Sequence, residues 1–137
     1  MLGGDERRRY GHRMPSQETL DRFVAMVLSN RHDEAIATFY TPDSTMQENL
    51  DPPRKGREAN LAREKAVMAR ATSIYSALEG PIFVHGDHVV IRWVFRFEFG
   101  DESCVTIDEI AYQRWAGELI AEERFYYDPA QRTPRRG

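Results

Sequence analysis

The side chains best suited to acid–base chemistry lie on stretches in which apolar and polar residues alternate. Glu48 lies two residues from Met46 and two from Leu50, so a strand over 45–50 would turn all three toward one side. An apolar wall favours the protonated form of a carboxyl group, which suits it to proton transfer near neutral pH. The sequence therefore predicts Glu48 as a catalytic acid or base. An ion pair with Arg124, or a place on the surface, remains the alternative.

A second acid lies in the stretch 103–115. Asp108 and Glu109 are adjacent, so a strand would turn them to opposite faces. Asp108 shares a face with Ile110 and Tyr112, and on that face Tyr112 would contact a ligand. A protonated Asp108 would stabilise an oxyanion that forms on the substrate.

The stretch 118–127 supplies the third catalytic candidate, Arg124. Its two-pronged guanidinium can bind a substrate carboxylate or an enolate oxygen, or it can pair with Glu122 or Glu48. Periodicity leaves open which face of this stretch lines a pocket. One face carries Leu119, Ala121, Glu123, Phe125 and Tyr127, and the other carries Ile120, Glu122, Arg124 and Tyr126.

No metal or cofactor is expected. His85 and His88 flank a Gly-Asp turn, but no further histidine is nearby to complete a metal site. The single cysteine, Cys104, cannot form an internal disulfide and lacks the setting of a nucleophile. No glycine-rich phosphate loop is present, so a nucleotide cofactor is not indicated.

Length and charge favour one globular domain flanked by basic tails. The chain has 137 residues and a net charge of −3. We expect one domain over 17–129, with flexible basic tails at 1–16 and 130–137, and Met14 is an alternative start. Because the domain itself is acidic, we expect no nucleic-acid partner. No apolar run is long enough for a membrane span, no signal peptide is visible, and the cytoplasm is the default location.

The elements that must position these residues are helices followed by strands. Apolar residues recur with helical spacing in 17–28, and Ser16 is the expected N-cap of this helix. A second helix follows Asp33, and a third is expected from about 56 to 70. From residue 72 the period changes to two, and glycine-containing turns separate the stretches. This order predicts an α+β fold with helices on one face of a curved antiparallel sheet. The expected strands are 72–79, 82–85, 88–99, 103–115 and 118–127.

The stretch 88–99 has one strongly apolar face, which we expect to meet the helices. That face carries Val89, Ile91, Trp93, Phe95, Phe97 and Phe99, whereas the opposite positions include charged residues. Trp93, Phe95 and Phe97 are expected to form a pocket wall together with Tyr126.

The sequence resembles the NTF2-like superfamily, specifically its SnoaL-like small-molecule branch. The similar stretches are RHDEAIATFYTPDSTMQENLDPPRKGREAN (31–60), GDHVVIRW (86–93) and WAGELIAEERFYYDP (115–129). The resemblance implies a cone-shaped half barrel with a deep pocket between sheet and helices, and a homodimer packed through the sheet. It does not fix the function, because the same cone holds isomerases, dehydratases, cyclases, epoxide hydrolases and binding proteins.

The resemblance also bears on individual residues. The general-base position of ketosteroid isomerases falls on Glu48, which favours Met46 and Glu48 as pocket-facing. The pocket-lining positions of the family fall on Trp93 and Phe95 of this sequence. In the last strand they fall on the face of Glu122, Arg124 and Tyr126. The oxyanion tyrosine of the isomerases falls on Val24. Their second aspartate has no clean equivalent in 103–115, where Asp108 and Glu109 are the nearest acids, and we prefer Asp108 as the second catalytic acid. The arginine and two aspartates of the epoxide hydrolases fall on Trp93, Phe95 and Arg124, so both specific chemistries are expected to be absent.

The sequence thus predicts a pocket for a small, mostly apolar organic ligand. If the protein is an enzyme, we expect cofactor-independent isomerase, lyase or cyclase chemistry with Glu48, Asp108 and Arg124 as catalytic residues. Met46, Trp93, Phe95, Tyr112, Glu122 and Tyr126 are the expected ligand-binding residues. The alternative is a non-catalytic ligand-binding or dimerisation module.

Overall fold

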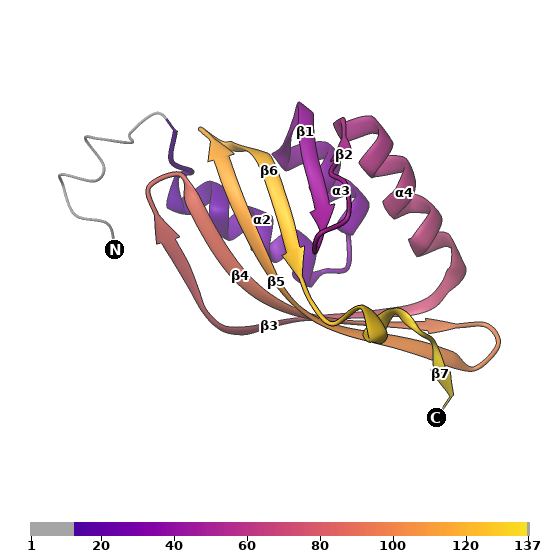
Figure 1. Cartoon of the computed structure of the whole chain (residues 1–137). Helices are drawn as coiled ribbons and strands as arrows, with labels where there is room; N and C mark the ends of the chain where they lie inside the picture. The colour runs from indigo at the N-terminus through magenta and orange to yellow at the C-terminus, as the bar shows by residue number, and fades with distance from the viewer. Residues whose placement is uncertain (1–12, 137) are drawn as a thin grey trace.

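Helices cover one face of a curved sheet in the computed structural model, which describes residues 13–136 (Figure 1). The helices are α2 (Gln17–Leu28), α3 (His32–Phe39) and α4 (Arg57–Arg70). Most of the predicted N-terminal tail, residues 1–12, lies outside the described part of the chain. None of the described helices is long and apolar enough to cross a membrane.

Helix α2 begins where the sequence predicts, because Ser16 caps it. The Thr19 amide donates a hydrogen bond to the Ser16 hydroxyl, at 3.1 Å, which satisfies one amide of the first turn. The apolar stripe of this helix, including Leu20, Phe23 and Val27, is buried against the sheet.

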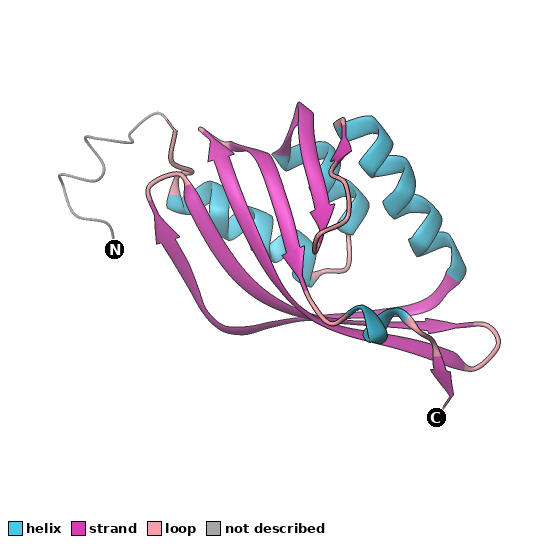
Figure 2. Cartoon of the chain, viewed as in Figure 1, coloured by secondary structure: helices cyan, strands magenta, loops and turns pink. Residues whose placement is uncertain are grey.

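The sheet contains seven strands in the described residues (Figure 2). Six of them follow the order β2-β1-β6-β5-β4-β3, and β7 pairs with β5. The predicted C-terminal tail contains a short 3-10 helix, η1 (Pro129–Arg132), and strand β7. The strands are β1 (Tyr40–Glu48), β2 (Arg54–Lys55), β3 (Ala71–His85), β4 (His88–Phe99), β5 (Ser103–Ala116), β6 (Leu119–Tyr126) and β7 (Arg135–Arg136).

Two details of the sheet differ from the sequence prediction. Strand β1 pairs with β6 in parallel, so the sheet is mixed rather than antiparallel throughout. The turn expected at Gly80-Pro81 is instead an irregularity inside the continuous strand β3, where the register against β4 shifts between Glu79 and Phe83. A bulge absorbs glycine and proline without ending an edge strand.

The core lies between the helices and the concave face of the sheet. The predicted apolar face of β4 is inward: Val89, Ile91 and Trp93 are at most 2% exposed. Phe23 of α2 meets Phe39 and Trp115 edge-on, with ring centroids 5.5 and 5.8 Å apart. The predicted α+β cone is confirmed, with an open, curved sheet wrapped around the helices.

Candidate functional site

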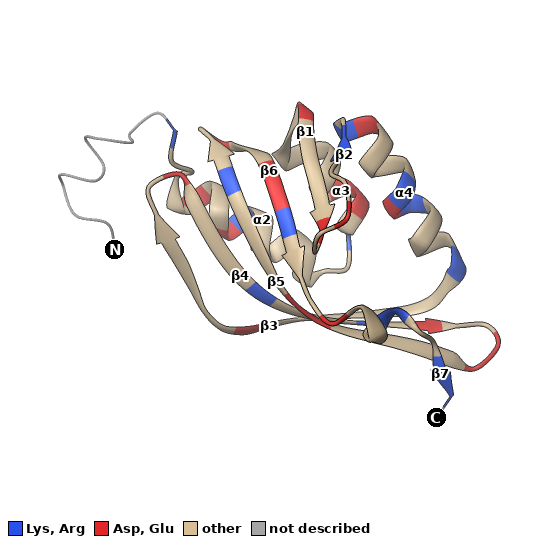
Figure 3. Ribbon diagram, in the orientation of Figure 1, with Lys and Arg blue, Asp and Glu red and all other residues tan. Residues whose placement is uncertain are grey.

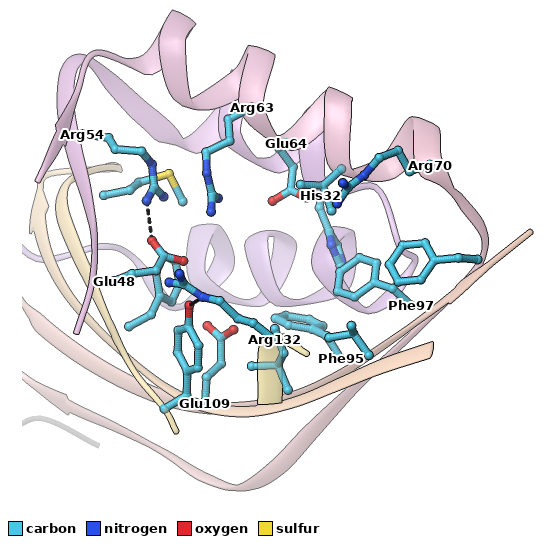
Figure 4. Close-up of a pocket in the computed structure, with 17 residues that line it drawn as sticks. His32, Glu48, Arg54, Arg63, Glu64, Arg70, Phe95, Phe97, Glu109 and Arg132 are labelled. Atoms are coloured by element: carbon cyan, nitrogen blue, oxygen red, sulfur yellow. Dashed lines mark hydrogen bonds and ion pairs between the residues drawn. The ribbon is translucent and has the colours of Figure 1, made fainter. Parts of the chain in front are cut away.

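A cavity of about 310 Å³ opens between α4 and the inner face of the sheet (Figure 4). This volume falls in the range of small-molecule sites. Its wall combines aromatic rings with charged side chains, which is the composition expected of a site that orients an organic molecule. The lining residues used below are His32, Met46, Glu48, Arg54, Arg63, Glu64, Arg70, Phe95, Phe97, Glu109, Tyr127 and Arg132.

A smaller cavity of about 60 Å³ extends the space toward α2 and α3. Met46 and Phe95 line both cavities, and Trp93 lines the inner one. The rings of Trp93 and Phe95 stack, with centroids 5.6 Å apart and planes 22° apart. Met46, Trp93 and Phe95 therefore lie on the cavity walls, where the sequence predicts them.

Glu48 lines the main cavity, as predicted, but its partner is Arg54. The Arg54 Nη1 donates to Glu48 Oε2 at 2.6 Å, and its Nε donates to Asn60 at 3.1 Å. The alternative of an ion pair with Arg124 is thus wrong in its partner. Leu50 is also not inward: it is 88% exposed, because β1 ends at Glu48 and Asn49 has a positive φ of 49°. Glu48 is thus a buried member of an ion pair rather than a free carboxylate.

Glu109, and not Asp108, is the second carboxyl group of the cavity. It is the register partner of Trp93, so it shares the inner face of the sheet with that ring. Only 8% of its surface is exposed, and its Oε2 has no hydrogen-bond partner within residues 13–136. Burial raises the pKa of Glu109 well above its ordinary value, and the nearby Glu123, Glu48 and Glu64 carboxyls add to the rise.

Asp108 lies on the convex face of the sheet, so the prediction that it lines the pocket is wrong. Arg92 binds it with two hydrogen bonds of 2.9 and 2.7 Å. This contact holds the pKa of Asp108 below its ordinary value. Ile110 and Tyr112, the apolar neighbours that favoured Asp108, are themselves 36% and 43% exposed. They mark an apolar patch on the outside of the sheet.

The face of Glu122, Arg124 and Tyr126 also points outward, which corrects the prediction for the last strand. These residues line a separate groove on the convex face. Arg124 donates from Nε to the Asn49 carbonyl at 2.9 Å and stacks over the Tyr126 ring at 4.8 Å.

A β-bulge in β6 explains why this strand was ambiguous. Glu122 pairs with Arg114, but the next partner along β5, Trp115, pairs with Ile120, so one extra residue lies between them. The bulge reverses the alternation within the strand. Ile120 is therefore inward before it, and Glu123 and Phe125 are inward after it.

Glu123 forms a buried polar network behind the inner cavity. The Tyr40 hydroxyl donates to its Oε1, and Gln113 Nε2 donates to its Oε2 at 2.7 Å. Trp115 Nε1 donates to Gln113 Oε1 at 3.0 Å and completes the chain. Burial raises the pKa of Glu123 to about 7, and the hydrogen bonds from Tyr40 and Gln113 limit this rise.

His32 was not predicted as a site residue, although it lines both cavities. It begins α3, and its Nε2 lies 2.8 Å from Ser76 Oγ on β3. Burial lowers the pKa of His32 to about 4, so the ring is neutral at neutral pH. Its ring lies 4.8 Å from that of Phe95, centroid to centroid, and the two form one wall.

This arrangement suits proton transfer on an organic molecule. Glu109 supplies a carboxyl group with an unpaired oxygen, and Glu64 has a pKa that burial raises, against the lowering effect of Arg63. Among residues 13–136, no group of three or more His, Cys, Asp or Glu side chains is placed to hold a metal ion.

Solved structures with the same fold come from several bacteria. A ketosteroid isomerase-like protein from Catenulispora acidiphila, in complex with trimethylamine, has a TM-score of 0.68 and 19% identity, over 85% of this chain and 89% of that chain. An NTF2-like protein of unknown function from Burkholderia pseudomallei has a TM-score of 0.68 and 13% identity, over 83% and 91%. An LEH-like epoxide hydrolase from M. tuberculosis has a TM-score of 0.66 and 13% identity, over 83% of each chain. At these identities the likeness concerns the fold.

A search of curated proteins finds no match. The family model of the SnoaL-like domain, however, matches residues 20–123, which include most of α2, the whole of α3 and α4, and Glu109. The chain therefore belongs to the SnoaL-like domain family.

Proposed function

We propose that the protein is a cofactor-independent isomerase, lyase or cyclase that moves a proton on a small, mostly apolar organic molecule. The observation that carries this proposal is Glu109, a nearly buried carboxyl group that lines an open, aromatic-walled cavity and has one oxygen with no hydrogen-bond partner within residues 13–136. Burial raises the pKa of this carboxyl group, which makes its carboxylate form a stronger base than an exposed one.

The proposed step begins with the carboxylate form of Glu109. It removes a proton from a carbon beside a carbonyl group, and the electron pair of the C–H bond moves onto the carbonyl oxygen as an enolate. Arg54 lines the same cavity, and the part of its guanidinium that binds neither Glu48 nor Asn60 can donate a hydrogen bond to that oxygen. Return of the proton to a different carbon completes an isomerisation, and loss of a β-hydroxyl group as water completes a dehydration.

The second candidate function is ligand binding without turnover. The observation that favours it is the ion pair between Glu48 and Arg54, since it engages the carboxylate that the family resemblance made the proton carrier. A protein that binds aromatic ligands in this cavity but transfers no proton would have this function.

The test uses a probe that needs no knowledge of the natural substrate. In 5-nitrobenzisoxazole a base removes the ring C–H proton, the N–O bond breaks, and a coloured cyanophenolate leaves. We expect catalysed ring opening above the buffer rate. The rate should rise with pH, because the reaction needs the carboxylate form of Glu109 and this form increases through a raised pKa. Turnover no faster than in buffer would remove the enzyme proposal and leave the binding function.

We further propose a homodimer packed through the convex face of the sheet. Exposed apolar side chains gather there beside ion pairs such as Arg92–Asp108, and Figure 3 shows charged positions among uncharged ones along β4, β5 and β6. An apolar patch with a polar surround is typical of a protein interface. The patch comprises Tyr75, Phe83, Ile110, Tyr112 and Tyr126.

Light scattering after size exclusion tests the dimer. We expect the mass of two chains for the wild-type protein and of one chain for Tyr112→Glu, because the new charge would be buried in the interface. Phe83 and Tyr112 lie on this face beside Val90, their common neighbour on β4. Leu28→Glu is the control, since Leu28 is an exposed residue of helix α2, which covers the opposite face of the sheet. A wild-type protein with the mass of one chain at all concentrations would contradict the proposal.

A further inference from the structure

Helix α4 turns one stripe of side chains toward the main cavity. Arg63, Glu64, Val67 and Arg70 line it, and their spacing places them on one side of the helix. In Figure 4, Arg63 and Arg70 extend from α4 into the space opposite Glu109. The cavity therefore has a basic wall facing a carboxyl-bearing wall.

The other two arginines that line the cavity are already engaged. Arg54 binds Glu48 and Asn60, and Arg132 donates to the Tyr127 hydroxyl and lies over that ring.

Arg63 differs, because no hydrogen bond or ion pair joins its guanidinium to any residue in the range 13–136. Arg70 contacts the Phe99 ring, with its guanidinium carbon 5.8 Å from the centroid. The chain thus leaves the hydrogen-bond donors of Arg63 available to a ligand.

The charges that face Arg63 do not cancel this basic wall. Four arginines line the cavity against three glutamates: Arg54, Arg63, Arg70 and Arg132 against Glu48, Glu64 and Glu109. Glu48 is held by Arg54, so it does not neutralise Arg63. Glu64 is half-buried and Glu109 is nearly buried, burial raises the pKa of both carboxyl groups, and His32 is neutral at neutral pH. The net charge of the side chains that line the whole cavity is therefore positive.

We propose that the ligand of this cavity is a monoanion, a flat conjugated carboxylate whose head group binds Arg63 and whose ring lies on Phe95 and Phe97. The planar guanidinium fits a carboxylate through two parallel hydrogen bonds. Arg63 offers one such two-bond site, so the proposal specifies a single carboxylate. This inference rests on the proposed function, since it names the substrate class of the same cavity.

Two probes of equal shape test the inference: naphthalene-2-carboxylate and naphthalene-2-carboxamide, which differ by one charge. Calorimetry on the full chain at low salt should show the carboxylate binding about tenfold more tightly than the carboxamide, as expected for one charge-assisted contact near the surface. The preference should shrink in Arg63→Gln and weaken with added salt. Lys65→Gln is the matched control, because Lys65 is exposed on the same helix and lies outside the cavity, so its preference should equal that of the wild type.

Three results would overturn the inference: no measurable binding of the carboxylate at millimolar concentration, equal affinities for the two probes, or an undiminished preference in Arg63→Gln. Arg63→Lys, which keeps the charge but not the planar fork, should fall between the wild type and Arg63→Gln. Ring opening of the neutral 5-nitrobenzisoxazole by the wild type involves no anionic probe. If the protein opens this ring but binds the two naphthalene probes equally, only the proposed carboxylate substrate is refuted. If it prefers the naphthalene carboxylate but does not open the ring, only the catalytic proposal is refuted.

Discussion

Replacing Glu109 by glutamine is expected to lower the rate of 5-nitrobenzisoxazole ring opening by about 100-fold or more. Glutamine keeps the size of the side chain but cannot accept the proton, and positioned acid–base groups contribute factors of this order. The free Oε2 of Glu109 is the reason for so large an effect, since no partner within residues 13–136 competes for it. The measurement is the initial rate at a pH where the wild type is fully active.

The matched control for this variant is Asp108→Asn. Asp108 is the chain neighbour of Glu109, but it lies on the convex face and binds Arg92. We expect this variant to retain the wild-type rate. Equal losses in the two variants would mean that the sheet, and not the proton carrier, had been damaged. An unchanged rate in Glu109→Gln would refute Glu109 as the catalytic base.

The stability of the fold should fall as pH rises from about 4.5 to 7, because of Glu123. The folded state raises the pKa of this carboxyl from 4.5 to about 7, so the folded protein binds the proton more tightly than the unfolded chain. The resulting stabilisation is fully present below the unfolded pKa and is lost as pH rises through the folded value. A shift of this size corresponds to about 3 kcal/mol in the free energy of unfolding.

Titration of His32 changes the free energy of unfolding with pH in the opposite direction, so the effect of Glu123 must be isolated with a variant. Its folded pKa of about 4 lies below the ordinary 6.5, and its stabilisation is lost as pH falls through that window. Glu123→Gln does not titrate at position 123 but keeps His32 and Glu109. We expect the urea-unfolding free energy of the wild type, minus that of Glu123→Gln, to fall by about 3 kcal/mol between pH 4.5 and 8. Parallel pH curves for the two proteins would show that Glu123 is not a buried titrating group.

The fold could be predicted from the sequence because the strongest patterns lie within single helices and strands. The period-two apolar face of β4 predicts the buried Val89, Ile91 and Trp93, and Ser16 predicts the start of α2. The alternation of Met46 and Glu48 predicts the inner face of β1. Each of these rests on side-chain direction within one element, which a sequence shows directly.

Asp108 and Glu109 were assigned to the wrong faces of the sheet because that assignment depends on the register between strands. Phe97 pairs with Val105 across the β4–β5 turn, so odd residues of β5 share the inner face with odd residues of β4. Counting outward from that turn places Glu109 inside and Asp108 outside. The patterning of Ile110 and Tyr112 misled the assignment because an apolar patch on the convex face resembles a core face.

Strand β6 could not be assigned from alternation at all. The bulge between Ile120 and Glu122 changes the inward positions from even to odd within one strand. Arg54 and Arg63 were missed for a different reason: Arg54 reaches the cavity through the pairing of β2 with β1, and Arg63 through the packing of α4 over the sheet. These contacts are between elements, and no periodicity within one element predicts them.

The central claim is that Glu109 carries a proton in this cavity, and its titration tests this most directly. Carbon-13 NMR of protein labelled at the glutamate carboxyl carbons would follow each side chain with pH, and Glu109→Gln would identify the signal. We predict that Glu109 changes protonation well above the ordinary value of 4.5, because burial and the neighbouring carboxyls disfavour its charge. A Glu109 signal that titrates near 4.5 would contradict the account.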